Sequence, residues 1–300
     1  FEVLPGAEIT CEANPGTADA RLFADLADLG VNRLSMGVQS FDDAELRWLG
    51  RIHDADQAEA AFGAARQAGF ANVNLDFIFG LPGQELAAWE RTLARAVGLG
   101  PEHLSLYGLT VEHGTPLYND VRLGRQVPPD DDLAADCYEL ALDRLAQAGY
   151  EQYEISNWQR GGHVCRHNLV YWRHEPYLGF GAGAHSFDGA RRWWNVRPVP
   201  EYVRRLQDGL SPERGGEPVD DRLAMGEFMM LGLRLVAEGV AEERFRARFG
   251  MAIDAVFGEE VAGLLRRGLL ERLPDRLRLT RAGRLLGNQV FAEFLEGSDR

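Results

Sequence analysis

Four side chains that can bind a polar ligand stand at or near the carboxyl ends of segments with strand-like sequence. They are Glu12, Gln39, Asp76 and Thr110, in the segments 7–12, 32–39 and 72–83 and just after 103–109. If these segments form parallel strands, their carboxyl ends meet on one face and the four side chains line one pocket. Arg51 could fold back to balance the acids. Because carboxylates and amides accept hydrogen bonds, such a pocket suits ribose hydroxyls and an amino group.

Asp76 is the most informative of these residues because it interrupts an apolar run. The segment 72–83 reads NVNLDFIFGLPG, which is typical of a strand buried on both faces, and Gly80, Pro82 and Gly83 end it. A buried carboxylate is costly unless something pairs with it. Asp76 therefore either belongs to a structural network or faces a ligand. Capping of backbone N–H groups would explain one such acid, but several at one rim favour a polar ligand.

A second group of candidate ligands lies in the segment HVCRHNLVYW. It places His163, Cys165 and His167 at alternate positions, on one face if the segment is extended. Three ligands on one strand rarely complete a tetrahedral zinc site, whereas heme iron needs only one or two axial ligands. The nearby residues that could form an apolar slot and pair a propionate are Tyr171, Trp172, Tyr177, Phe180, Arg166 and Arg173. The alternative is an ordinary hydrogen-bonded histidine in an aromatic core.

The composition excludes several classes of protein. The 300 residues, 45% of them hydrophobic, suffice for a large core in one domain with an appendage or in two domains. The 32 basic and 46 acidic residues give a net charge of −14, which argues against binding to nucleic acid or to an anionic membrane. No apolar run is long enough for a membrane span, and three widely spaced cysteines give no disulfide framework. We therefore expect a cytoplasmic protein.

Strand-like and helical segments alternate four times between residues 7 and 109, which predicts an α/β fold with a parallel sheet. No glycine-rich phosphate loop follows these strands, so we predict a partial TIM-like (β/α) barrel with its site-forming loops over residues 1–200. Residues 201–300 are mainly helical with a hairpin at Pro274-Asp275, which predicts a winged-helix-like domain. Because the chain is acidic, we expect this domain to have a structural or docking role rather than to bind DNA.

Six motifs carry a resemblance to a known family. In chain order they are SMGVQSF, NLDFIFGLPGQ, LSLYGLT, YEISNW, HNLVYW and LGFGAGAHS. Together they resemble the oxygen-independent coproporphyrinogen III oxidase branch of the radical S-adenosylmethionine (SAM) superfamily. YEISNW and HNLVYW are more similar to the heme chaperone subgroup (HemW type) of that branch than to the oxidase. The resemblance covers nearly the whole chain, including the C-terminal domain.

The resemblance implies a SAM cavity at the strand ends. Glu12 in CEANP matches the acid that binds SAM in the oxidase. The positions that match contacts to a second SAM are Gln39, Arg51 and Asp76. Thr110 and His185 match, more loosely, positions that line the same cavity. If the chaperone subgroup binds no second SAM, the roles of the three second-SAM positions reduce to shaping the pocket.

The chain departs from the family on its N-terminal side. The family's CxxxCxxC loop, which holds a 4Fe-4S cluster on three thiolates, does not occur, and no pair of Cys11, Cys137 and Cys165 has that spacing. The glycine-rich segment that contacts SAM does not occur either. Without the cluster, SAM is not reduced to its radical. We therefore expect an N-terminally truncated sequence that lacks the first two strand–helix units and is inactive as a radical enzyme.

The resemblance implies a heme chaperone, which binds heme and passes it to an acceptor protein, with SAM and a 4Fe-4S cluster in the full-length protein. It makes His167 the first candidate for the heme ligand and Cys165 the second. The alternative is the oxidase itself, which decarboxylates propionate side chains in porphyrin biosynthesis. Two other classes are a winged-helix binding module and a metal-independent barrel enzyme. The latter would need a base such as a lysine at the strand ends, and none lies there.

Overall fold

The computed structural model describes residues 2–295, and its chain forms two compact units, Phe1–Val164 and Cys165–Arg300. The predicted domain boundary at residue 200 falls inside the second unit. The segment HNLVYW, which we assigned to the barrel, is thereby grouped with the C-terminal half of the chain.

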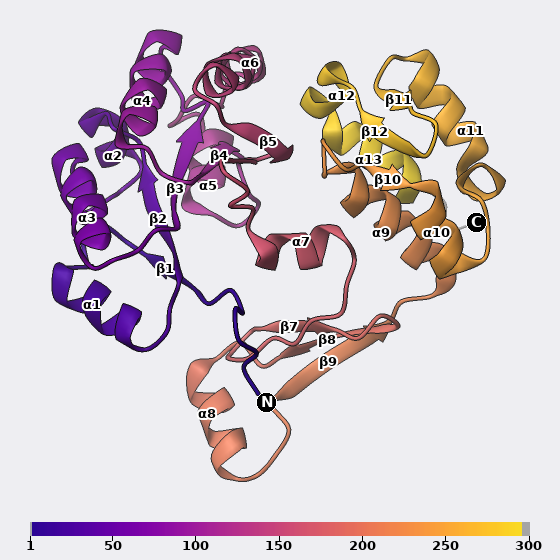
Figure 1. Cartoon of the computed structure of the whole chain (residues 1–300), viewed down its shortest axis with the longest axis horizontal. Helices are drawn as coiled ribbons and strands as arrows, with labels where there is room; N and C mark the ends of the chain where they lie inside the picture. Colours follow the sequence, from indigo (N-terminus) through magenta and orange to yellow (C-terminus); the bar gives the residue numbers. More distant parts are fainter. Residues whose placement is uncertain (1, 296–300) are drawn as a thin grey trace. The chain divides into compact units, whose positions relative to one another are not determined.

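The first unit contains a six-stranded, mostly parallel sheet with the order β1-β2-β3-β4-β6-β5 (Figure 1). Its strands are β1 (Thr10–Ala13), β2 (Arg33–Gln39), β3 (Val73–Phe79), β4 (His103–Gly108), β5 (Glu151–Glu154) and β6 (Asn157–Gln159). Strands β1 to β4 are parallel, and β6 and β5 add to the β4 edge in antiparallel orientation. The sheet is open in the part of the chain that the structure describes, which agrees with a partial rather than a closed barrel.

Helices alternate with the parallel strands as the sequence predicts. They are α1 (Ala20–Asp28), α2 (Asp43–Trp48), α3 (Ala55–Gln67), α4 (Leu86–Leu99), α5 (Pro116–Arg122) and α6 (Asp131–Gln147). Four of the six helices begin at an aspartate N-cap: Asp19, Asp42, Asp54 and Asp130. The Asp42 side chain accepts from two backbone N–H groups of α2, and Asp54 forms a capping box with Gln57. Asp19 caps α1, because its carboxylate accepts from the backbone N–H of Leu22 at 2.8 Å.

The two faces of the parallel sheet differ in character. Alternate residues of each strand point to opposite faces, and one set joins the main hydrophobic core with α1, α3, α4 and α6. From the strands this set includes Leu34, Met36, Val38, Val73, Leu75, Phe77, Phe79, Leu104 and Leu106. The other set is polar and includes Glu12, Ser35, Asn74, Asp76, His103 and Ser105. The strand at residues 73–79 is therefore well covered, as predicted, but only one of its faces is apolar.

The second unit begins with α7 (Arg166–Trp172), which corrects the prediction of an extended or irregular segment there. An antiparallel sheet of β7 (His185–Phe187), β8 (Arg191–Asn195) and β9 (Glu213–Pro218) follows, with α8 (Val199–Gln207) between β8 and β9. Residues 156–197, which we expected to be loops, thus include regular elements. Their strands β6, β7 and β8 are only 3, 3 and 5 residues long and therefore carry little local signal.

The rest of the unit has the element order of a winged helix, which confirms the prediction. Its elements are α9 (Asp221–Leu233), β10 (Val240–Ala241), α10 (Glu242–Phe249), α11 (Ile253–Arg266), β11 (Leu270–Arg272), β12 (Arg276–Leu279), α12 (Arg281–Leu285) and α13 (Gly287–Leu295). The three strands form a small sheet of order β10-β12-β11, with the hairpin turn where Pro274-Asp275 predicts it. Phe228, Phe245 and Phe257 pack edge to face in its core, with ring centroids about 6 Å apart.

A buried carboxylate ties α9 to the first part of the second unit. Glu227 receives two hydrogen bonds from the Arg192 guanidinium, at 2.8 and 2.9 Å, and lies 3.1 Å from His174 Nε2. Burial opposes the charge, but these contacts outweigh it and lower the pKa of Glu227. The segment that follows α7 is therefore anchored to the winged helix by charge as well as by packing.

Gly80 is the residue that turns the chain at the end of β3, and we predict that Gly80→Ala destabilises the fold. Its φ is +73°, and an added Cβ would lie 3.1 Å from the Ala134 Cβ. The left-handed backbone alone costs a residue with a Cβ about 1–2 kcal/mol, so the free energy of unfolding in urea should fall by at least that amount. Gly63→Ala in the middle of α3 is the control, since nothing lies within 4 Å of its added Cβ, and it should leave the protein equally or more stable. Equal effects of the two substitutions would contradict this account of the turn.

Candidate functional site

Asp76 lies at the centre of a hydrogen-bond network on the polar face of the sheet. Asn74 Nδ2 donates to Asp76 Oδ1 at 2.7 Å, and Ser35 Oγ on the neighbouring strand β2 donates to Asp76 Oδ2 at 3.1 Å. Asn74 Nδ2 also lies 2.7 Å from Ser35 Oγ, which accepts from it. The carboxylate is thus held from two strands. Of the two roles considered for Asp76, a structural network or a ligand contact, the structural network is present.

The network continues away from Asp76 through buried polar groups of β4 and β5. Asn74 Oδ1 accepts from His103 Nδ1 at 2.6 Å and from Ser105 Oγ at 3.1 Å. On its other side, His103 Nε2 lies 2.9 Å from the Tyr153 hydroxyl. Asn74, His103 and Ser105 are almost completely buried, so these bonds form in a medium of low polarity where an unmade bond would be costly.

Burial sets the protonation of both ionisable groups in this network. It raises the pKa of Asp76, more than the side chains of Asn74, Ser105 and Ser35 lower it, and the charge of Glu12 raises it further. Burial also lowers the pKa of His103 well below its ordinary value, and the charges of Arg33 and His163 act in the same direction. His103 is therefore a neutral imidazole at physiological pH.

Glu12 lies on the same face of the sheet as Asp76. In the strand register Glu12 is opposite Ser35, Ser35 is opposite Asn74, and Asn74 is opposite His103, so polar residues form one row across four strands. Glu12 is the end of this row at the exposed β1 edge. The structure therefore brings the two predicted acids together, near enough for the charge of one to affect the pKa of the other.

Gln39 and Arg51 lie at the carboxyl end of β2 and in the loop that follows α2. Gln39 is buried and has a φ of +72°, next to an irregularity in the pairing of β2 with β3. The preceding carbonyl, of Val38, is held 3.1 Å from His53 Nε2. Arg51 is half-buried and makes no ion pair in the described part of the chain. Thr110 is exposed after β4, with its hydroxyl 3.5 Å from the Gly108 carbonyl.

The turn after β3 is positioned by its own Gln84 and by Glu45 of α2. The Gly80 N–H donates to Gln84 Oε1 at 2.8 Å, and Gln84 Nε2 donates to Glu45 Oε1 at 2.9 Å. Ser40, directly after Gln39, donates to the other oxygen of Glu45. The loops that follow β2 and β3 are thus joined by one carboxylate, which fixes the rim around Gln39 and Asp76.

His185 belongs to the second unit. It is exposed on β7, with its ring centroid 5.8 Å from that of Trp194. Its assignment to the SAM cavity stays a prediction.

The candidate heme ligands do not share one face, which corrects the expectation from their alternate spacing. Residues 166–172 form α7; Cys165 is its N-cap, with extended backbone, and His167 lies in the first helical turn, so the alternation of a strand does not hold between them. Cys165 is buried at the N-cap, whereas His167 is exposed. His163 belongs to the first unit.

Helical spacing instead brings aromatic residues to the side of His167. Tyr171, one turn later, packs edge to face against the imidazole at a centroid distance of 4.9 Å, and Tyr177 lies 4.6 Å from Tyr171. Burial and the neighbouring Tyr177 raise the pKa of Tyr171. This arrangement leaves His167 accessible beside two aromatic rings, which suits a flat apolar ligand better than a metal ion alone.

Comparisons with known proteins identify both halves of the chain. Residues 2–96 match the family model of the radical SAM superfamily, and residues 219–286 match that of the HemN C-terminal domain. The chain is 40% identical over 288 residues to the heme chaperone HemW of Bacillus subtilis, which covers 96% of this chain and 76% of that protein. It is also 40% identical over 295 residues to the heme chaperone HemW of Mycobacterium tuberculosis, covering 98% and 73%. The chain belongs to the HemW family.

A solved structure supports the same fold. The coproporphyrinogen III oxidase HemN from Escherichia coli, a radical SAM enzyme, superposes with a TM-score of 0.79 at 22% identity, over 96% of this chain and 69% of that one. This likeness confirms the architecture. The sequence relatives at nearly twice that identity are HemW proteins, so the resemblance to the chaperone subgroup is confirmed.

The radical SAM superfamily implies SAM and a 4Fe-4S cluster, and the described residues fit these groups unequally. A carboxylate face with Glu12 and Asp76 suits the donor groups of SAM. The cysteines do not suit a cluster, because Cys11 lies on β1, Cys137 is buried in α6 and Cys165 is in the second unit. Among residues 2–295 no three His, Cys, Asp or Glu side chains are placed to hold a metal ion.

Sequence reasoning missed the partners of Asp76, chiefly Asn74, His103 and Tyr153. The signal for Asn74 was present: in NVNLDF, Asn74 and Asp76 are two apart, which places both on one face of a strand. His103 and Tyr153 are 29 and 50 residues from their partners along the chain, and no local pattern indicates such contacts.

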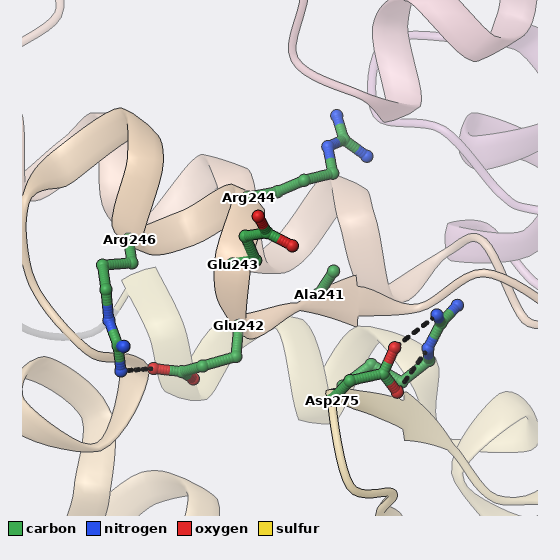
Figure 2. A pocket seen from close by; sticks show the side chains of 7 residues that line it. Ala241, Glu242, Glu243, Arg244, Arg246 and Asp275 are labelled. Atoms are coloured by element: carbon green, nitrogen blue, oxygen red, sulfur yellow. Dashed lines mark hydrogen bonds and ion pairs between the residues drawn. The ribbon is translucent and has the colours of Figure 1, made fainter.

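A pocket in the second unit contains none of the predicted site residues. Its volume is about 360 Å³, and it is lined by Ala241, Glu242, Glu243, Arg244, Arg246, Asp275 and Arg276. Figure 2 shows Arg246 directed at Glu242, and a second ion pair joins Arg276 to Asp275 at 2.7 Å. Its charges are thus largely balanced within the pocket. In residues 2–295 no helix is both long and apolar enough to cross a membrane.

The raised pKa of Asp76 predicts that its ionised carboxylate lowers the stability of the folded protein. Because the folded protein disfavours the charged carboxylate, Asp76→Asn should increase the free energy of unfolding at pH 7. This gain in stability should be smallest below pH 3.8, the ordinary pKa, where Asp76 is protonated in the unfolded chain as well. It should grow as the pH rises from there through the raised pKa of Asp76 in the folded protein. Urea denaturation of both proteins between pH 4 and pH 8 measures it. A variant that is less stable at pH 7 than at pH 4, relative to the parent, would contradict this assignment.

Proposed function

We propose that this protein is a heme chaperone that binds heme and passes it to an acceptor protein, and that its full-length form also binds SAM and a 4Fe-4S cluster. The observation that carries the proposal is the match to heme chaperones along almost the entire chain, including the C-terminal domain. The carboxylate face of the sheet and the aromatic surroundings of His167 are the two places where we propose that SAM and heme bind.

At the SAM site this chain's own residues would act as hydrogen-bond acceptors and shape the rim. Glu12 and Asp76 would accept from the amino group and ribose hydroxyls of SAM, and the Gln39 amide would complete the set. The two carboxylates would also complement the positive charge of the sulfonium. When bound with the cluster, SAM supplies a reducible sulfonium, but the residues of this chain do not form the cluster site, and we assign them no radical step.

The oxidase is the second candidate. The likeness to the oxidase structure, at 22% identity, supports the fold alone, whereas the heme chaperones are 40% identical to this chain. The two activities separate cleanly: only an oxidase converts coproporphyrinogen under anaerobic, reducing conditions with consumption of SAM.

We predict that Glu12→Gln in the full-length, cluster-containing protein weakens SAM binding. A hydrogen bond to a charged group contributes about 1.5–3 kcal/mol, so the Kd measured by calorimetry should rise roughly 10- to 100-fold. Glu90→Gln is the matched control, because this carboxylate lies on α4 and pairs with Arg144 at the surface. An unchanged Kd for Glu12→Gln would remove Glu12 from the SAM site.

For heme, we predict that His167→Ala reduces the Soret absorbance obtained on titration and weakens binding about tenfold or more, because it removes an axial ligand. Cys165→Ala should change binding little, since its thiol is buried at the start of α7. His113→Ala, in a loop of the first unit where the ring packs on Tyr118, is the control. Loss of heme binding in Cys165→Ala but not in His167→Ala would reverse the assignment, and a flat titration of the parent protein would refute the heme site.

A further inference from the structure

We infer that Tyr153, His103 and Asn74 form a positioning relay that holds the Asp76 carboxylate as an acceptor for the donor groups of SAM. The inference rests on the proposed SAM site and names residues of that site which do not touch the ligand themselves. Its basis is the direction of the hydrogen bonds in the network, which all run towards Asp76.

The neutral state of His103 fixes this direction. A neutral imidazole has one donor and one acceptor nitrogen. Its Nδ1 faces the Asn74 carbonyl oxygen at 2.6 Å, so Nδ1 carries the proton. Nε2 is then the acceptor, and the Tyr153 hydroxyl at 2.9 Å donates to it.

The orientation of the Asn74 amide follows from its four contacts. His103 and Ser105 both donate to Oδ1, while Nδ2 donates to Asp76 and to Ser35. A rotation of the amide by 180° would place Oδ1 against the Asp76 carboxylate and Nδ2 against the two donors. The Asp76 contact opposes the rotation, because two acceptor oxygens would then face each other. His103 and Ser105, as donors to Oδ1, favour the orientation in which the amide presents a donor to Asp76.

This orientation determines that Asp76 recognises hydrogen-bond donors of a ligand. An ionised carboxylate offers about four acceptor positions, and Asn74 and Ser35 contact one oxygen each. Asp76 is only half-buried, so acceptor positions face the polar side of the sheet. Because the relay supplies donors from behind, the carboxylate stays an acceptor towards ligand hydroxyl or amino groups. The hydrogen bonds from Asn74 and Ser35 lower the pKa of Asp76 against the effect of burial, and so favour the form that accepts rather than donates.

The first test uses Asn74→Asp, which keeps the shape and replaces the donor by a second carboxylate. Full-length, cluster-containing protein should bind SAM about tenfold or more weakly at pH 8. The deficit should shrink as the pH falls to about 5.5, because one of two adjacent carboxylates then takes a proton and becomes a donor. The charged or titratable groups that face this pair are Glu12, Arg33, His103, Tyr153 and His163. Asn119→Asp, on the exposed side of α5, adds the same charge as a control.

The second test separates positioning from packing at His103, and it also serves if Asn74→Asp does not fold. His103→Gln retains an N–H group that can reach Asn74, whereas His103→Leu does not. We expect His103→Gln to keep SAM binding within about threefold and His103→Leu to lose about tenfold. Equal losses in both variants, or a pH-independent deficit in Asn74→Asp, would overturn the relay while leaving the SAM site intact. If the parent protein did not bind SAM, the proposed function would be refuted, and so would the proposal that the relay positions Asp76 for SAM.

Discussion

The hydrogen bond between the Asn74 amide and the Asp76 carboxylate is the interaction on which the candidate site depends. It joins two residues of one strand and is held by donors from β4 on one side and by Ser35 from β2 on the other. The opposite face of the same strand lies in the hydrophobic core with α3, α4 and α6. The fold thus fixes a costly polar group by surrounding it with rigid, buried elements, which is the usual physical condition for a preorganised binding site.

Burial in this network shifts the pKa values of Asp76 and His103. Burial raises the pKa of Asp76 and lowers that of His103, so each group is pushed towards its neutral form. His103 becomes neutral and can then both accept and donate, which a charged imidazole could not do. The rim is secured separately, by Glu45 through Ser40 and Gln84, so the loops around the site do not depend on the ligand for their position.

The sequence predicted the strands, the alternating helices and the winged helix because each carries a local signal, either apolar periodicity or the Pro274-Asp275 turn. It also predicted that Glu12 and Asp76 share a face, because parallel strands leave few alternatives. It could not predict the partners of Asp76, which come from distant strands. It was wrong about the segment from His163 to Trp172, where two-residue spacing favoured a strand but i,i+4 contacts such as His167–Tyr171 stabilise a helix. The strand β9, ERGGEP, has no apolar alternation at all, so only its pairing with β8 defines it.

The central claim is that the polar face around Asp76 binds SAM in the full-length protein. Hydrogen–deuterium exchange of the cluster-containing protein, with and without SAM, tests it most directly, because loops at the carboxyl ends of β1, β2 and β3 carry exchangeable amides next to that face. The account predicts that SAM slows exchange in residues 13–17, 39–41 and 79–84 and leaves the winged helix unchanged. Unaltered exchange in all three segments at saturating SAM, or protection confined to the second unit, would contradict it.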